Sequence, residues 1–289
     1  RNTFSNSREN NNVVFDLKSE KTLSTDISYV FRNPIITSKV TAYYTSIKDA
    51  TEISFYFADG VGGDNTAFVQ EILSGINKKH LGLEFGLEAQ VTSTFKLKGA
   101  ASVGQFTYDN NPNLVLTTEA DSESLSAGFV DGFKAFGETN LKNYKLAAGP
   151  QNAYSFGFEY RDPDYWWLGA TVNFFSNTFI DISPLNRSKN FYLDDDGLPF
   201  LDYDKTIAKQ LLTQEKFSNY SVVNLVGGKS LKIKDYYLSV FATVNNLLNK
   251  KYKSGGFEQG RNANYRQLKE DKSLDKPIFG SKYWYGRGT

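Results

Sequence analysis

The sequence predicts an all-β fold, an antiparallel sheet of the kind that forms part of a transmembrane β-barrel. Three observations lead to this prediction: strict alternation of apolar and polar residues, a composition rich in aromatic residues and glycine, and tight turns that alternate with long connections. Aromatic residues make up 15% of the 289 residues, with 18 Tyr and 23 Phe beside 23 Gly and only 7 Pro. About eight strands are expected.

Five segments alternate with period two, which places apolar side chains on one face of a strand and polar side chains on the other. On a helix the same apolar residues would spread around the whole circumference. The segment from His80 to Val91 is the clearest, since six consecutive pairs fit. In chain order, the apolar members are Thr25, Ile27, Tyr29 and Phe31; Leu81, Leu83, Phe85, Leu87, Ala89 and Val91; Tyr154, Phe156, Phe158 and Tyr160; Trp166, Leu168, Ala170, Val172 and Phe174; and Leu238, Val240, Ala242 and Val244.

The connections are of two kinds. Short turns are expected at 33–34, 92–94, 162–164 and 233–235, where Asn, Pro, Asp, Ser and Thr interrupt the alternation. Longer irregular connections are expected at roughly 58–68, 110–150, 181–216 and everywhere after 250. In transmembrane barrels, short turns lie on the periplasmic side and long loops on the extracellular side. The alternation therefore favours a barrel, although a soluble β-sandwich remains an alternative.

Composition excludes several classes of protein. The 33 basic and 32 acidic residues give a net charge of +1, so a nucleic-acid partner is not expected. There is no cysteine and only one histidine, His80, and no serine lies in a Gly-x-Ser-x-Gly elbow. The parts of catalytic triads and of zinc or haem sites are thus missing. We expect no enzymatic activity and no cofactor, and a solvated position for His80 in the lumen or at its rim.

Several runs resemble a known family. SEKTLSTDISYVFRNP, in which Asp26 and Tyr29 alternate within a strand, resembles a strand signature of TonB-dependent outer-membrane receptors. VFATVNNLLNKKY, with Asn246, Leu247 and Tyr252, resembles the penultimate-strand signature of the same family. GETNLKNYKLAAGPQNAYSFGFEYRDPDYWWLGATVNFFSN, GGFEQGRNANYRQL and FGSKYWYGRGT are similar to barrels of receptors from the Bacteroidetes lineage.

This resemblance implies a bacterial outer-membrane location and a 22-stranded barrel, plugged by an N-terminal domain and energised by TonB. The chain shows no plug domain and no TonB-contacting box, and it stops at Gly288-Thr289, where the family would continue into one more strand. Residues 1–289 are therefore expected to be the C-terminal portion of the barrel. The expected partners are the remainder of the receptor with its plug, TonB through the absent N-terminal part, outer-membrane lipid and, by resemblance alone, a surface lipoprotein lid.

Two sets of residues follow from the barrel hypothesis. Polar residues opposite the apolar faces are expected to face the lumen, where they contact water, the plug or a polar substrate: Glu84, Glu88, Gln90, Glu159 and Arg161. Aromatic residues just after two of the turns are expected to form a membrane-interface girdle, with ordinary β-core packing as the alternative: Tyr165, Trp166, Trp167, Tyr236 and Tyr237.

The acidic stretch LDDDGLPFLDYD is a weak candidate for a calcium site, through Asp194, Asp196, Asp202 and Asp204. Its spacing does not match an EF-hand loop, which favours a solvated run of charge. The leading functional hypothesis is TonB-energised nutrient uptake, with iron chelates, glycans and peptides all open as substrates. The alternatives are a small self-closed outer-membrane barrel with a structural or adhesive role and a soluble carbohydrate-binding β-sandwich.

Overall fold

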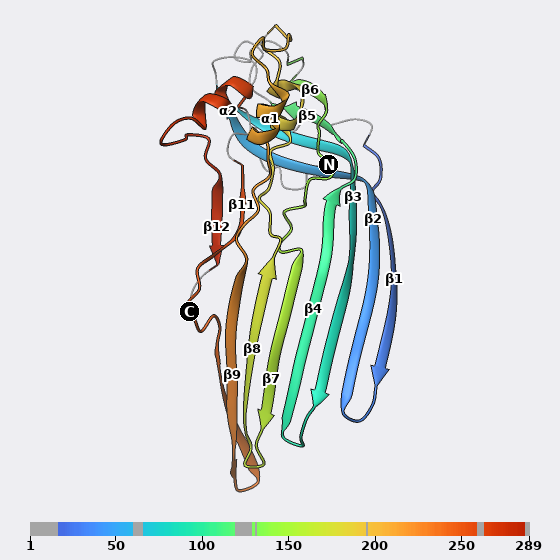
Figure 1. The fold of residues 1–289 in the computed structure, drawn as a ribbon, viewed down its shortest axis with the longest axis vertical. Coiled ribbons are helices and arrows are strands. Elements are labelled where there is room, and N and C mark those ends of the chain that lie inside the picture. The colour runs from blue at the N-terminus through green and yellow to red at the C-terminus, as the bar shows by residue number, and fades with distance from the viewer. Residues whose placement is uncertain are drawn as a thin grey trace.

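The computed structural model describes residues 17–59, 66–118, 129–130, 132–194, 196–258 and 263–286. Figure 1 shows a tall curved sheet. Tight turns lie at one end of it, the turn end, whereas the helices and longer connections gather at the other end, the loop end. The predicted all-β antiparallel architecture is confirmed.

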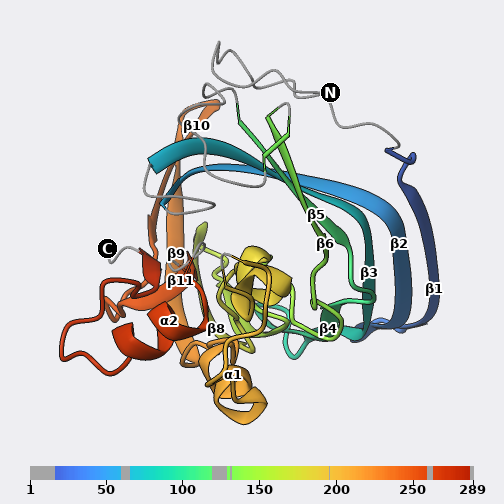
Figure 2. The same cartoon turned by 90° about the horizontal axis from the view of Figure 1, so that it is seen from above.

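The main sheet follows the path β1-β2-β3-β4-β7-β8-β9-β10, so the expected eight strands are present. Every neighbouring pair on this path is antiparallel. Seen from above, these strands form an arc rather than a closed circle (Figure 2), and β1 and β10 are its edges. The bounds are β1 (Lys21–Arg32), β2 (Ile36–Asp59), β3 (Thr66–Gln90), β4 (Phe95–Tyr108), β7 (Asn152–Arg161), β8 (Trp166–Ser176), β9 (Tyr220–Ile233) and β10 (Tyr236–Val244).

Smaller elements fill the loop end. The strand β5 (Asn113–Thr117) pairs with β3 and with β6 (Phe133–Glu138), while β11 (Tyr252–Phe257) and β12 (Lys282–Gly286) form a separate two-stranded sheet. The helical segments are η1 (Leu185–Arg187), η2 (Lys189–Phe191), α1 (Lys205–Leu211) and α2 (Tyr265–Asp271). Among the residues the structure describes, neither α-helix is long and apolar enough to cross a membrane.

The predicted long connections need correction. Those at 110–150, 181–216 and after 250 contain the short strands and helices just named, which were missed because each is too short to show a clear period. The connection expected at 58–68 is shorter than predicted, because β2 ends at Asp59 and β3 begins at Thr66. Residues 60–65 between them lie outside the described part.

The four predicted turns are confirmed at the turn end. Side-chain oxygens of Asn33, Thr92 and Asp162 each accept a hydrogen bond from a backbone N–H of their own turn. Lys234, in the turn between β9 and β10, has a φ of 57°. Polar side chains that bond their own backbone and residues in the left-handed region are what close two-strand connections.

Strand register divides the main sheet into two faces, because partners across a ladder point to the same side. Leu83 lies beside Ala42 and Val103, while Glu84 lies beside Thr41 and Ser102. The apolar face is strongly exposed, with exposed fractions of 75% at Ile27, 57% at Leu83, 61% at Phe156 and 63% at Val240. An apolar surface of this extent marks an interaction surface.

The halves of β2 and β3 nearer the loop end bend away from the arc. These strands have 24 and 25 residues, so each spans about 80 Å at 3.3 Å per residue. The register shifts between Ile47 and Ala50, and the residues at the bend, Asp49 and Gly75, have φ values of 57° and 69°. Figure 2 shows the outer parts of both strands turning across the open side of the arc.

The hydrophobic core lies at the loop end, beneath the bent part of β2 and β3. One cluster joins these strands to β5, β6 and η1 through Leu73, Ile76, Leu114, Phe136 and Leu185. A second cluster joins η2 to α1 and α2 through Phe191, Ala208, Tyr265 and Leu268. Because the described strands of the main sheet form one open layer, they make neither a two-sheet sandwich nor a self-closed small barrel.

Candidate functional site

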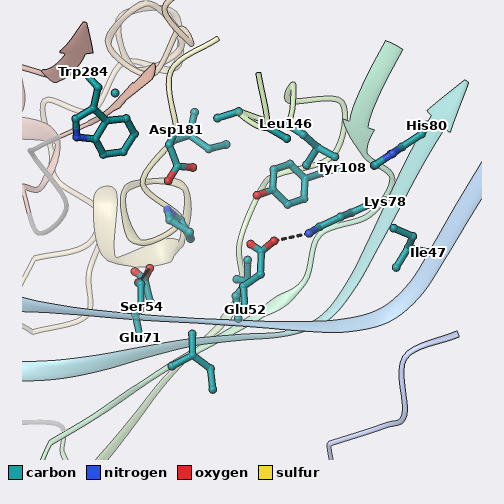
Figure 3. Close-up of a pocket in the computed structure, with 17 residues that line it drawn as sticks. Ile47, Glu52, Ser54, Glu71, Lys78, His80, Tyr108, Leu146, Asp181 and Trp284 are labelled. Carbon is teal, nitrogen blue, oxygen red and sulfur yellow. Dashed lines mark hydrogen bonds and ion pairs between the residues drawn. The ribbon is translucent and has the colours of Figure 1, made fainter. Parts of the chain in front are cut away.

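A cavity of about 510 Å³ opens at the loop end between the bent hairpin of β2 and β3 and the segments that pack over it. Its walls come from widely separated parts of the chain, and Figure 3 shows their side chains converging on one space. The contributing segments are β2, β3, the end of β4, residues 146–148 and 181–184, β11 and β12.

One side of the cavity is a linked group formed by Glu52, Lys78 and Tyr108. Lys78 pairs with the carboxylate of Glu52, as the dashed line in Figure 3 marks. The hydroxyl of Tyr108 is also hydrogen-bonded to Glu52. Burial raises the pKa of Tyr108, and the negative charges of Glu52, Asp181 and Glu71 raise it further. The carboxylates of Glu52, Asp181 and Glu71 therefore all act on the same hydroxyl, which stays a neutral donor.

A second side is formed around Glu71, which is only 5% exposed. Ser54 donates a hydrogen bond to Glu71 Oε1 at 2.9 Å, and Tyr56 donates one to Oε2 at 3.0 Å. Both donors lie on β2 and share a face with Glu52 because residues two apart on a strand point the same way. The ladder that joins β2 to β3 thus fixes the direction of this carboxylate.

The opposite wall carries Asp181 and Trp284. Asp181 is exposed, and its backbone N–H donates to the carbonyl of Gly256 at 3.0 Å, which ties its segment to β11. Trp284, on β12, lies across Gly255: a Cβ at that position would come within 2.8 Å of the indole ring. Because Gly255 has no side chain, the indole ring can lie over the backbone of β11 at the cavity wall.

His80 lines the same cavity. Its ring stacks against Phe106 at 4.9 Å between centroids, and its Nε2 is buried without a hydrogen-bond partner among the described residues. The expectation of a solvated histidine is therefore met only in part, because the side chain lines the cavity but its ring packs on Phe106 and its Nε2 is buried. Burial and the nearby positive charge of Lys78 lower the pKa of His80, so its imidazole is neutral at pH 7.

A buried ion pair holds the segment that carries Asp181. Arg187 donates to both carboxylate oxygens of Glu258, at 2.7 Å from Nη1 and 2.9 Å from Nη2. The same guanidinium donates to the carbonyls of Ser183 and Leu212 and lies 4.5 Å from the ring of Tyr144. Burial lowers the pKa of Arg187, but the contact with Glu258 outweighs this effect and leaves the pKa raised.

The predicted lumen residues share the polar face of the main sheet near the turn end. Lys96 pairs with Glu88 at 2.8 Å, Lys98 pairs with Glu159 at 2.6 Å, and Arg161 also pairs with Glu159. The side chain of Gln90 instead donates to the backbone carbonyl of Thr92 in the adjacent turn, at 2.7 Å. Glu84 lies further along the same face of β3, towards the cavity.

The predicted aromatic girdle is divided between the two faces. Register places Trp166 beside Lys229 and Tyr236 beside Ile233 on the apolar face. It places Trp167 beside Arg161 and Tyr237 beside Lys232 on the polar face, where the cations lie 6.0 Å and 5.9 Å from the rings. Tyr165 lies in the turn itself, 6.0 Å from the ring of Tyr237.

A family model, TonB dependent receptor-like β-barrel, matches residues 2–247 of the sequence. The chain belongs to this family. The resemblance seen in the sequence is therefore confirmed at the level of the family. Members of this family are outer-membrane receptors and transporters rather than enzymes. No curated protein is significantly similar to this receptor barrel.

Several solved structures resemble part of this chain. They include the copper transporter OprC, at 17% identity and a TM-score of 0.47, covering 82% of this chain and 27% of that one. The FrpB iron transporter from Neisseria meningitidis is 14% identical, with a TM-score of 0.47 and coverage of 84% and 29%. A mutant of the ferric enterobactin receptor PfeA from Pseudomonas aeruginosa is 15% identical, with a TM-score of 0.44 and coverage of 83% and 27%. The receptor barrel described here thus spans less than a third of these chains.

The acidic stretch of this receptor barrel is used structurally. Asp194 accepts hydrogen bonds from the backbone of its own turn, and the hydrogen bond from Arg266 lowers the pKa of Asp202. Asp204 is the N-cap of α1, and the backbone N–H groups of the first turn lower its pKa. Among the described residues, no three acidic or histidine side chains are grouped closely enough to hold a metal ion. Asp195 lies outside the described residues.

Most residues of the cavity were not predicted from the sequence. Glu52, Glu71, Tyr108, Asp181 and Trp284 are spread over more than 230 positions and come together only through the fold. No local motif links them. The one available signal was the length of the alternating pattern around Glu52 and Glu71, which continues beyond what a membrane-crossing strand needs.

Proposed function

We propose that residues 1–289 are the C-terminal portion of the barrel of a bacterial outer-membrane receptor that takes up a nutrient. The observation that carries this proposal is the family match over residues 2–247. The two-faced open sheet supports it, because a lipid-facing wall needs one continuous apolar face and a hydrated lumen needs the opposite face to be polar.

In this proposal the apolar face contacts outer-membrane lipid and the polar face lines the lumen. The ion pairs on the polar face keep their hydration and stabilise the wall against the plug or a passing substrate. Trp166 and Tyr236 act at the membrane interface, while Trp167 and Tyr237 stand at the rim of the lumen and Tyr165 stands in the turn between them. The lumen-facing set is Glu84, Glu88, Gln90, Glu159 and Arg161.

The remainder of the receptor is proposed to pair with the edges of the sheet. Strands β1 and β10 each have one partner strand among the described residues. A strand edge cannot stay unpaired in hydrocarbon, because water is not there to satisfy its backbone groups. Additional barrel strands, with the plug inside them, are the proposed partners.

The cavity at the loop end is the proposed substrate contact. It lies on the inner side of the bent hairpin, beyond the part of the sheet that crosses the membrane. A nutrient captured there moves inward when TonB displaces the plug, and a surface lipoprotein of the Bacteroidetes type covers the loop end. Uptake by this route requires the whole receptor rather than this segment alone.

The topology is tested by labelling single cysteines, because the segment has none of its own. Leu201→Cys places a thiol at a fully exposed site at the loop end, and Asp164→Cys is the matched exposed site at the turn end. In intact cells that carry the whole receptor, an impermeant maleimide should modify Leu201→Cys alone. After lysis it should modify both. Equal labelling of the two in intact cells would contradict the proposed topology.

The division between this segment and the remainder is tested by reconstitution. Eight strands give too small a circumference for a channel that also holds a plug. The segment alone in liposomes should therefore show no energy-coupled uptake, whereas the whole receptor in cells should lose uptake when TonB is depleted. Energy-coupled flux through the segment alone would refute this part of the proposal.

A further inference from the structure

The charges around the loop-end cavity are unbalanced. Among the described residues, three carboxylates line it, from Glu52, Glu71 and Asp181, against one ammonium, that of Lys78. His80 adds a neutral imidazole and no positive charge to oppose a cation. A cavity whose wall carries a net charge of one sign raises the local concentration of ligands of the opposite charge. The cavity therefore favours positively charged ligands over negatively charged ones.

The three carboxylates are held by different partners from different parts of the fold. Glu71 is fixed by Ser54 and Tyr56, and Glu52 is fixed by Lys78. Asp181 comes from the opposite wall, as Figure 3 shows. Since no group of three such residues in the described part of the chain is placed to hold a metal ion, the negative field suits an extended ligand better than a single bare ion.

The rest of the wall suits the body of an organic cation. Trp284 presents an indole ring, and an aromatic face attracts ammonium and guanidinium groups. Aliphatic side chains complete the lining: Ile47, Ile53, Leu73, Leu146 and Ile182. The combination of carboxylates, an aromatic ring and aliphatic surface matches a ligand with amino or guanidinium groups on an apolar frame.

We propose that this cavity selects organic cations, carrying amino or guanidinium groups, as the substrate class of the receptor. The inference rests on the proposed function, since it assigns the substrate chemistry of the same site. Asp181 and Trp284 form one wall of the selective surface, and Glu52 and Glu71 form the other.

The test measures binding to the purified whole receptor by calorimetry, with trilysine amide, triglutamate and triglycine as probes. Trilysine amide should bind at least about tenfold more tightly than the other two, with an affinity that falls as salt is raised. Asp181→Asn should weaken trilysine binding about fivefold, equivalent to about 1 kcal/mol for one partly exposed ion pair. Trp284→Leu should weaken it as well. The matched control is Asp235→Asn, an exposed aspartate in the turn between β9 and β10, which should change nothing.

Equal binding of trilysine amide and triglutamate, or equal effects of Asp181→Asn and Asp235→Asn, would overturn the inference. Either result is compatible with the proposed receptor function, provided that in intact cells the maleimide modifies Leu201→Cys and not Asp164→Cys. A failure of the sidedness experiment refutes the receptor function instead, and it is read from labelling rather than from binding. The two failures are therefore distinguishable.

Discussion

Replacing Glu258 with glutamine tests whether the buried ion pair with Arg187 holds the loop end together. The side chain of Arg187 is 1% exposed and both of its terminal nitrogens bond to Glu258. Removing one partner of a buried pair costs about 3–5 kcal/mol, because it leaves an uncompensated charge away from water. Glu258→Gln keeps the shape and one acceptor, so we expect about 3 kcal/mol.

The effect should be local, because the pair joins loop-end segments and not strands of the main sheet. Amide hydrogen exchange of the whole receptor in detergent, followed by mass spectrometry, resolves this. Peptides that cover 181–188 and 252–258 should exchange on the order of 100-fold faster, the factor that corresponds to about 3 kcal/mol. Peptides from β7 and β8 should be unchanged.

The matched control is Glu215→Gln. Glu215 pairs with Lys253 at 2.9 Å, but the two side chains are about a third exposed, at 35% and 31%. An exposed pair contributes about 0–1 kcal/mol, so exchange should rise no more than about fivefold. If Glu258→Gln and Glu215→Gln accelerate exchange equally, burial is not what gives the pair of Arg187 and Glu258 its effect, and the reasoning fails.

Three further predictions concern the wall and the helices. Phe85→Arg should destabilise the receptor by about 2–4 kcal/mol in urea titrations in lipid, whereas Glu84→Arg, on the other face, should change stability little; equal losses would reject the assignment of faces. A nitroxide at Leu83 should be relaxed by oxygen and shielded from polar reagents, and a label inaccessible to both would indicate a packed protein core instead. Asp204→Ala should speed amide exchange in Lys205–Leu211, while Asp204→Asn, which keeps the acceptor, should not; identical exchange in both variants would show that the cap is not used.

The strands of the main sheet could be predicted because their pattern is local. Phe85 has an exposed apolar side chain and Glu84 has an exposed polar one. This alternation can be seen by comparing neighbouring residues in the sequence. The turn chemistry at Asn33 and Asp162 is local as well. For the same reason the helices left signals that were not used: Asp204 ahead of α1, and Asn264 with Gln267 in a capping box at α2.

The loop end could not be predicted in the same way. Arg187 and Glu258 are 71 positions apart, and nothing near either residue distinguishes a buried ion pair from a solvated one. Asp204 makes the same point from the other side, since the sequence favoured a solvated run of charge there, whereas this carboxylate caps a helix. In both cases the partner that decides the role of the charge is brought in by tertiary structure.

The bend in β2 and β3 explains how one pair of strands serves both the wall and the cavity. In the part of β2 nearer the turn end, the odd-numbered residues face inward. Ile47 is the last of them, and it lines the cavity. The register shift at Asp49 adds one residue, so beyond it the even-numbered Glu52 and Ser54 face inward instead. Gly75 makes the matching change on β3. A shift of one residue exchanges the two faces of a strand. Without the shifts, Glu52 and Glu71 would continue the apolar, outward face of the sheet. The two residues with positive φ therefore lie where a strand pair with one polar and one apolar face changes into one that presents Glu52 and Glu71 to the cavity.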